Sequence, residues 1–196
     1  MPVGRASSKS RRSDAAIPTA SNAVRRHAAE SDQRTLRWFA IWTRSRHERA
    51  VYDQLTERGI EAFLPTVARW SRWKDRKKKI DWPLFPGYCF GRFEAAGRLA
   101  VLKCAGVVSI VSFEGAPVAV PDAEIEAIRR LVDSALPYDP CPMLKTGTRV
   151  EVVHGPLKGV VGKLQRKGPH ARLVLSVDLI GRGVSVQVDA ADIREL

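Results

Sequence analysis

Residues 83–93 read PLFPGYCFGRF, which places two prolines and four aromatic residues within one short stretch. Its two prolines restrict the backbone φ angle, and Gly87 lets the chain bend, so the next strand starts in a fixed direction. Because side chains alternate along a strand, Tyr88 and Phe90 should lie on one face and Cys89 on the other.

The residues before this stretch predict a strand, a helix and a second strand. RWFAIWT at 37–43 is rich in aromatic and β-branched residues, which is typical of a strand. Residues 45–59 predict a helix in which Ser45 and Glu48 form a capping box. A strand at 60–66 follows.

The remaining elements complete an α+β domain. Residues 67–80 predict a basic β-hairpin, 84–93 and 107–113 predict strands, and 94–104 and 121–135 predict helices. This order favours an antiparallel sheet with helices on one face, an α+β sandwich.

The character of the chain changes after a proline-rich segment. Short runs of alternating apolar and polar residues, punctuated by glycine, predict a small all-β barrel. The N-terminal residues have too few large apolar side chains to form a core. They are either a solvated tail or a nonspecific phosphate tether. We therefore expect a disordered basic tail (1–34), an N-terminal domain (35–136), a linker (137–146) and a C-terminal barrel (147–196).

Charge and composition narrow the function. The 196 residues carry a net charge of +12, which indicates an anionic partner such as nucleic acid. The three cysteines form no CxxC pair, and no catalytic or metal-binding motif is present. We expect a monomeric cytoplasmic binding protein with free thiols, no metal, no cofactor, no enzymatic activity and no membrane partner.

Two segments together carry a family pattern. PLFPGYCFGRF follows the strand and helix described above, and GTRVEVVHGPLKGVVGKL at 147–164 looks like a KOW motif. In this order they resemble the NusG family of transcription elongation and antitermination factors, over about residues 37–196. FEGAPVAVP at 113–121 looks more like specialised paralogs of the RfaH type than like the housekeeping factor.

The resemblance implies a role on RNA polymerase. The NusG-type N-terminal domain would bind the clamp helices and suppress pausing or termination. The KOW domain would recruit a partner such as a small-subunit ribosomal protein or Rho. The polymerase-binding positions that match are Trp42, Phe85, Tyr88 and Phe90. For Phe85 and Phe90, the alternative interpretation is that they form the domain core.

The resemblance also assigns contacts to the non-template DNA strand. In the first loop and helix the candidates are Arg44, Arg46, His47, Gln54 and Arg58, of which Arg44, Gln54 and Arg58 match the family by position. In the hairpin, cations near Trp70 and Trp73 are typical of single-strand binding, and they are Arg72, Lys74, Arg76, Lys77, Lys78 and Lys79. A solvated helix face and an exposed basic turn are the alternatives.

In the barrel, the resemblance places a partner-binding loop at Leu179, Ile180 and Arg182, which otherwise form an ordinary turn. A ribosome-associated KOW protein that binds RNA is the rival function. It would explain the charge and the barrel, but not the residue 83–93 pattern. Co-purification with polymerase or with ribosomal subunits separates the two.

Overall fold

The computed structural model describes residues 35–73, 76–142, 147–166 and 170–196, including their side chains except at 69–73, 76–79, 142, 166 and 170. The expected N-terminal tail and part of the expected linker lie outside these residues. The described residues form one compact unit.

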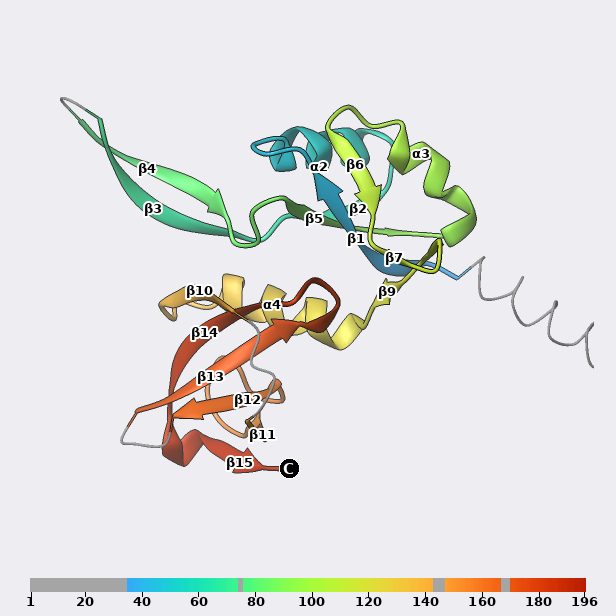
Figure 1. The fold of residues 1–196 in the computed structure, drawn as a ribbon. Helices are drawn as coiled ribbons and strands as arrows, with labels where there is room; N and C mark the ends of the chain where they lie inside the picture. The colour runs from blue at the N-terminus through green and yellow to red at the C-terminus, as the bar shows by residue number, and fades with distance from the viewer. Residues whose placement is uncertain (1–34, 74–75, 143–146, 167–169) are drawn as a thin grey trace, which may run out of the picture. The chain divides into compact units, whose positions relative to one another are not determined.

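The first sheet is antiparallel and five-stranded, and β1 lies at its centre. Its order is β2-β5-β1-β6, and β9 also pairs with β1 (Figure 1). Its strands are β1 (Arg37–Thr43), β2 (Glu61–Phe63), β5 (Tyr88–Phe93), β6 (Val107–Ile110) and β9 (Ala119–Val120). The accompanying helices are α2 (Glu48–Glu57), η1 (Ala95–Gly97), α3 (Arg98–Leu102) and α4 (Asp122–Asp133).

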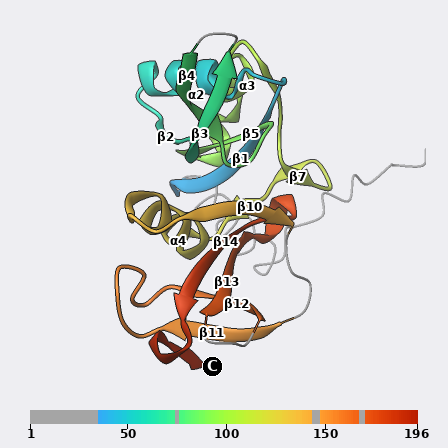
Figure 2. The ribbon, with the colours of Figure 1, turned by 90° about the vertical axis from the view of Figure 1, so that its left-hand side faces the viewer.

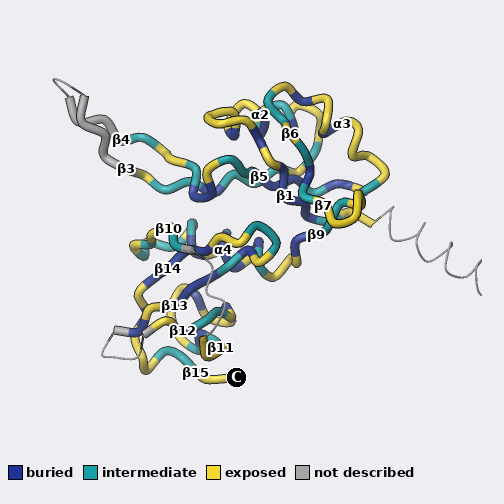
Figure 3. Tube along the Cα trace, in the orientation of Figure 1, coloured by how far each residue is buried: buried dark blue, intermediate teal, exposed yellow. Residues whose placement is uncertain are grey.

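Helices cover both faces of this sheet, so the expectation of helices on one face was wrong. Trp38 and Ala40 of β1 belong to a core cluster with residues of α4, while Phe39 and Ile41 belong to a second cluster with residues of α2 and α3. Four consecutive residues of β1 are buried, as the dark blue of Figure 3 shows. A strand that is apolar at successive positions needs cover on both sides.

Two hairpins complete this half of the chain. The long one pairs β3 (Thr66–Trp73) with β4 (Arg76–Pro83), and the short one pairs β7 (Ser112–Phe113) with β8 (Ala116–Pro117). The long hairpin is the one predicted from the basic segment. Figure 2 shows its two strands running side by side.

Two local predictions differ from the structure. Helix α2 starts at Glu48 after His47, which makes no side-chain cap, so the Ser45–Glu48 capping box does not form. The Glu48 carboxylate instead accepts a hydrogen bond from the backbone of Gly87 at 2.7 Å. The strand expected over 84–93 begins only at Tyr88, since the residues before it form a turn.

The second sheet is antiparallel and contains six strands in the order β10-β14-β13-β12-β11-β15. This confirms an all-β C-terminal part and, with the first sheet, the predicted α+β class. Its elements are β10 (Tyr138–Pro142), β11 (Thr148–Val152), β12 (Val161–Arg166), β13 (His170–Val177), η2 (Asp178–Ile180), β14 (Arg182–Asp189), η3 (Ala190–Asp192) and β15 (Ile193–Glu195).

Strand β10 corrects the prediction of a linker without regular structure. Its register with β14 runs from Tyr138 opposite Val186 to Pro142 opposite Arg182. The prolines are tolerated because β10 is an edge strand, where a missing backbone donor costs no sheet hydrogen bond.

Candidate functional site

An exposed aromatic surface lies where β1 and β5 meet. Trp42 pairs with Tyr88 in the register of the two strands, so their side chains are neighbours on one face. The Trp42 side chain is 48% exposed, and Tyr88 is partly buried. We call these two residues the Trp42–Tyr88 surface. Both were predicted polymerase contacts, and the structure brings them together.

A glycine turn holds this surface in place. Gly87 has a φ of 84°, and a Cβ atom added there would lie 3.8 Å from the Trp42 indole. Its N–H donates to the Glu48 carboxylate, which is in a buried residue, and its carbonyl accepts from the Thr43 N–H at 2.8 Å. These bonds fix the path of the chain directly before Tyr88.

Phe85 and Phe90 lie in the core, as the alternative interpretation held. Their exposed fractions are 2% and 0%, and their rings meet edge to face with centroids 5.9 Å apart. The ring centroid of Phe63 lies 6.2 Å from that of Phe90, and both residues belong to the same side of the sheet. Neither Phe85 nor Phe90 is therefore accessible to a partner in this structure.

Exposed cations stand on the turn from Arg44 to His47, which we call the Arg44–His47 turn. Arg44, Arg46 and His47 are all exposed. The His47 N–H donates to the Arg44 carbonyl at 3.0 Å, and Arg46 has a left-handed φ of 63°. The structure thus brings three of the predicted nucleic-acid residues together.

The other two residues predicted from α2 make internal contacts. The Gln54 amide bonds to the backbone of Ala50 and Ala105. Arg58 is exposed, and its Nη1 donates to the Gln54 carbonyl at 2.9 Å, which turns the guanidinium back along the helix.

A hollow of about 830 Å³ lies beside this turn. Arg46, Arg49, Asp81, Trp82 and Pro86 are among the residues that line it. The Trp82 side chain is 48% exposed. An exposed indole next to guanidinium groups can stack a planar ligand and pair with its negative charge.

The backbone register of the basic hairpin sets cations opposite tryptophans. Trp70 pairs with Lys79, Trp73 with Arg76, and Arg72 with Lys77. Lys78 also lies in β4, whereas Lys74 is outside the described residues. The predicted residues therefore occupy neighbouring positions on two paired strands.

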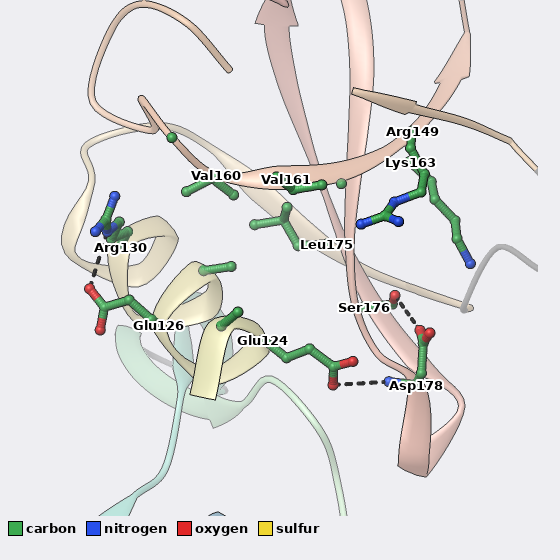
Figure 4. A pocket seen from close by; sticks show the side chains of 14 residues that line it. Glu124, Glu126, Arg130, Arg149, Val160, Val161, Lys163, Leu175, Ser176 and Asp178 are labelled. Atoms are coloured by element: carbon green, nitrogen blue, oxygen red, sulfur yellow. Dashed lines mark hydrogen bonds and ion pairs between the residues drawn. The ribbon is translucent and has the colours of Figure 1, made fainter. Parts of the chain in front are cut away.

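The predicted partner loop of the second sheet contacts α4. Leu179 and Ile180 are in η2, are partly buried and pack against the core cluster, while Arg182 at the start of β14 is exposed. Glu124 of α4 accepts a hydrogen bond from the Asp178 N–H at 3.3 Å (Figure 4). Packing against this cluster thus covers part of the apolar surface that the loop was expected to present.

A hollow of about 580 Å³ lies between α4 and the second sheet. Its lining includes Glu124, Arg130, Arg149 and Lys163, which Figure 4 shows around it. Arg130 of α4 donates a hydrogen bond at 3.0 Å to the carbonyl of Lys158, in the loop between β11 and β12.

Glu124 makes this junction sensitive to pH. The pKa of Glu124 is raised from 4.5 to about 7, mainly by burial and secondly by the Asp178 carboxylate, although the Asp178 N–H and Lys163 oppose the shift. Between about pH 4.5 and about pH 7, Glu124 keeps its proton in the folded chain but loses it in the unfolded chain. The free energy of unfolding therefore falls as pH rises through this range.

We expect Glu124→Gln to lose part of this pH dependence. Between about pH 5 and about pH 7.5, the wild-type free energy of unfolding should fall by about 1 kcal/mol more than that of the variant, after allowance for solvent screening. Urea denaturation of both proteins at the two pH values measures this difference. Equal pH dependence in both would contradict it.

Among the described residues, no group of three or more His, Cys, Asp or Glu side chains could hold a metal ion. None of the helices in the described part of the chain has the length and apolar character needed to cross a membrane.

Comparison with known proteins identifies the part of the chain that carries the Trp42–Tyr88 surface. Residues 36–129 match the family model described as "Transcription termination factor nusG". These residues form a NusG domain. This confirms the family resemblance for residues 36–129, which include both α2 and the basic hairpin.

One solved structure agrees with this at the level of the fold. The structure described as "Domain interaction in Thermotoga maritima NusG" has a TM-score of 0.51 and 22% identity, covering 84% of this chain and 99% of that one. The MjSpt4:Spt5 complex in conformation B has a TM-score of 0.26 and 17% identity, covering 81% and 96%. No curated protein matches this chain.

Sequence reasoning missed three residues that shape the NusG domain surface. Glu48 was assigned to a helix cap, although its carboxylate accepts a hydrogen bond from the Gly87 N–H. Gly106, whose carbonyl accepts from the Arg44 N–H, was not singled out. Trp82 was not selected either, although an aromatic residue between a basic segment and two prolines was a usable signal. The contacts of Glu48 and Gly106 are long-range, so no local pattern marks them.

Proposed function

We propose that this chain is a transcription elongation factor, which binds RNA polymerase through the Trp42–Tyr88 surface of its NusG domain. The observation that carries the proposal is the exposed indole of Trp42 beside Tyr88, held by the Gly87 turn within a domain of this family. Exposed aromatic side chains on a rigid support are typical anchors of protein interfaces.

Nucleic acid is the second ligand in this proposal. The Arg44–His47 turn follows Trp42 directly in the sequence, and the basic hairpin comes shortly before Tyr88. The net charge of the chain is +12. Cations for phosphates combined with tryptophans for bases favour a single strand, such as the displaced non-template DNA. The chain would act as a monomer in the cytoplasm and without catalysis of its own.

The second sheet would recruit a further factor, such as a small-subunit ribosomal protein or Rho. Leu179, Ile180 and Arg182 remain our candidates for this contact. Because Leu179 and Ile180 pack against the core cluster in this structure, they would bind a partner fully only after leaving that cluster.

A pausing assay on purified RNA polymerase tests the proposal. We expect the chain to shorten the lifetime of pauses on a defined template and to remain with the elongation complex during affinity purification. Co-purification with ribosomal subunits alone, with no effect on pausing, would favour the ribosome-associated alternative and reject the polymerase role.

A further inference from the structure

We infer that Gln54 is a positioning residue that holds the Arg44–His47 turn, rather than a direct nucleic-acid contact. This inference rests on the proposed function, in which the cations of that turn meet a nucleic-acid strand. It reassigns a residue that the family resemblance placed among the DNA contacts.

The Gln54 amide is already occupied by the protein backbone. Nε2 donates to the Ala50 and Ala105 carbonyls, both at 3.0 Å, and Oε1 accepts from the Ala105 N–H at 2.9 Å. A primary amide has two N–H donors, so both have partners here. Donation to a base or phosphate would require one of these bonds to break.

The loop that Gln54 holds supports the cationic turn directly. Gly106 follows Ala105, and its carbonyl accepts from the Arg44 N–H at 2.8 Å. Gly106 has a φ of 97°, and a Cβ atom added there would lie 2.8 Å from the Cβ of His47. The backbone at Ala105 and Gly106 therefore packs closely against the His47 side chain and supports the turn.

The turn needs this support because its backbone is unfavourable. Arg46 has a φ of 63°, which a residue with a side chain adopts only when the surrounding contacts impose it. Arg44 and Arg46 are both exposed on this turn. Loss of the hydrogen bonds between Gln54 and Ala105 would free this backbone and let both cations move apart. Nucleic-acid binding would then weaken although no charge is removed.

Two lysine variants on one face of α2 distinguish a positioning role of Gln54 from a direct nucleic-acid contact. Ala50 is exposed one helical turn before Gln54, so Ala50→Lys adds the same charge without removing the side-chain amide. The probe is a labelled single-stranded DNA oligonucleotide. We expect Ala50→Lys to bind as tightly as wild type or more tightly, and Gln54→Lys to bind about tenfold more weakly.

Hydrogen exchange of the free protein provides a readout independent of DNA. Gln54→Lys should accelerate exchange of the Ala105 amide by about tenfold, because a lysine cannot accept its hydrogen bond. Gln54→Glu, which retains an acceptor, should accelerate it less and serves if the lysine variant does not fold. Ala50→Lys should leave this exchange unchanged.

Unchanged exchange at Ala105 in Gln54→Lys, or tighter DNA binding by that variant, would overturn the inference. If wild type binds no single-stranded DNA, the nucleic-acid part of the proposed function fails. In that case faster exchange would still support the positioning role of Gln54 within the fold, and unchanged exchange would reject it.

Discussion

Trp42→Ala is expected to weaken polymerase binding by about 30-fold or more, since a buried aromatic anchor typically contributes about 2 kcal/mol or more to an interface. The free chain should keep its unfolding midpoint, because the Trp42 side chain is 48% exposed and belongs to neither core cluster. Titration of labelled chain with core polymerase, together with thermal unfolding, measures both effects.

Tyr88→Ala should act in the same direction, with a small loss of stability because its ring packs partly against the core. Phe113→Ala is the matched control, since Phe113 is 70% exposed in the β7–β8 hairpin. It should change neither binding nor stability. Wild-type affinity in both Trp42→Ala and Tyr88→Ala would exclude this surface from the interface.

Phe90→Ala is expected to lower the free energy of unfolding by about 3 to 5 kcal/mol, the usual cost of removing a fully buried ring. Phe90 has no exposed surface and packs between Phe63 and Phe85. Urea denaturation measures the loss. Phe90→Leu, which fills more of the space, should cost clearly less.

This result would separate the two interpretations of the aromatic stretch. A variant Phe90→Ala that keeps its stability but fails to bind polymerase would show that Phe90 is an anchor and not part of the core. We expect the reverse, so that any loss of binding follows from loss of the folded domain.

The sequence predicted most of the helices and strands, but not which faces of the first sheet the helices cover. Alternation correctly predicted that Tyr88 and Phe90 share one face and Cys89 lies on the other. The burial of β1 on both faces could be read only from its neighbours, because periodicity does not show which side a helix packs against. Prolines around Tyr138–Pro142 concealed an edge strand for a related reason, since such strands tolerate them.

The candidate site was predictable in composition but not in geometry. Exposed Trp42 and the cations Arg44 and Arg46 were found from residue type and family pattern. The distinction between Tyr88 at the rim and Phe90 inside depends on tertiary packing. The same holds for Gln54, whose partner Ala105 lies 51 residues away in sequence.

Strand β10 has a consequence for how far the C-terminal half can travel. Since α4 ends at Asp133 and β10 begins at Tyr138, residues 134–137 alone connect the two elements. Four extended residues reach at most about 14 Å. Any rearrangement that keeps β10 paired with β14 is thus limited by the length of this connection. A larger displacement requires β10 to separate from β14.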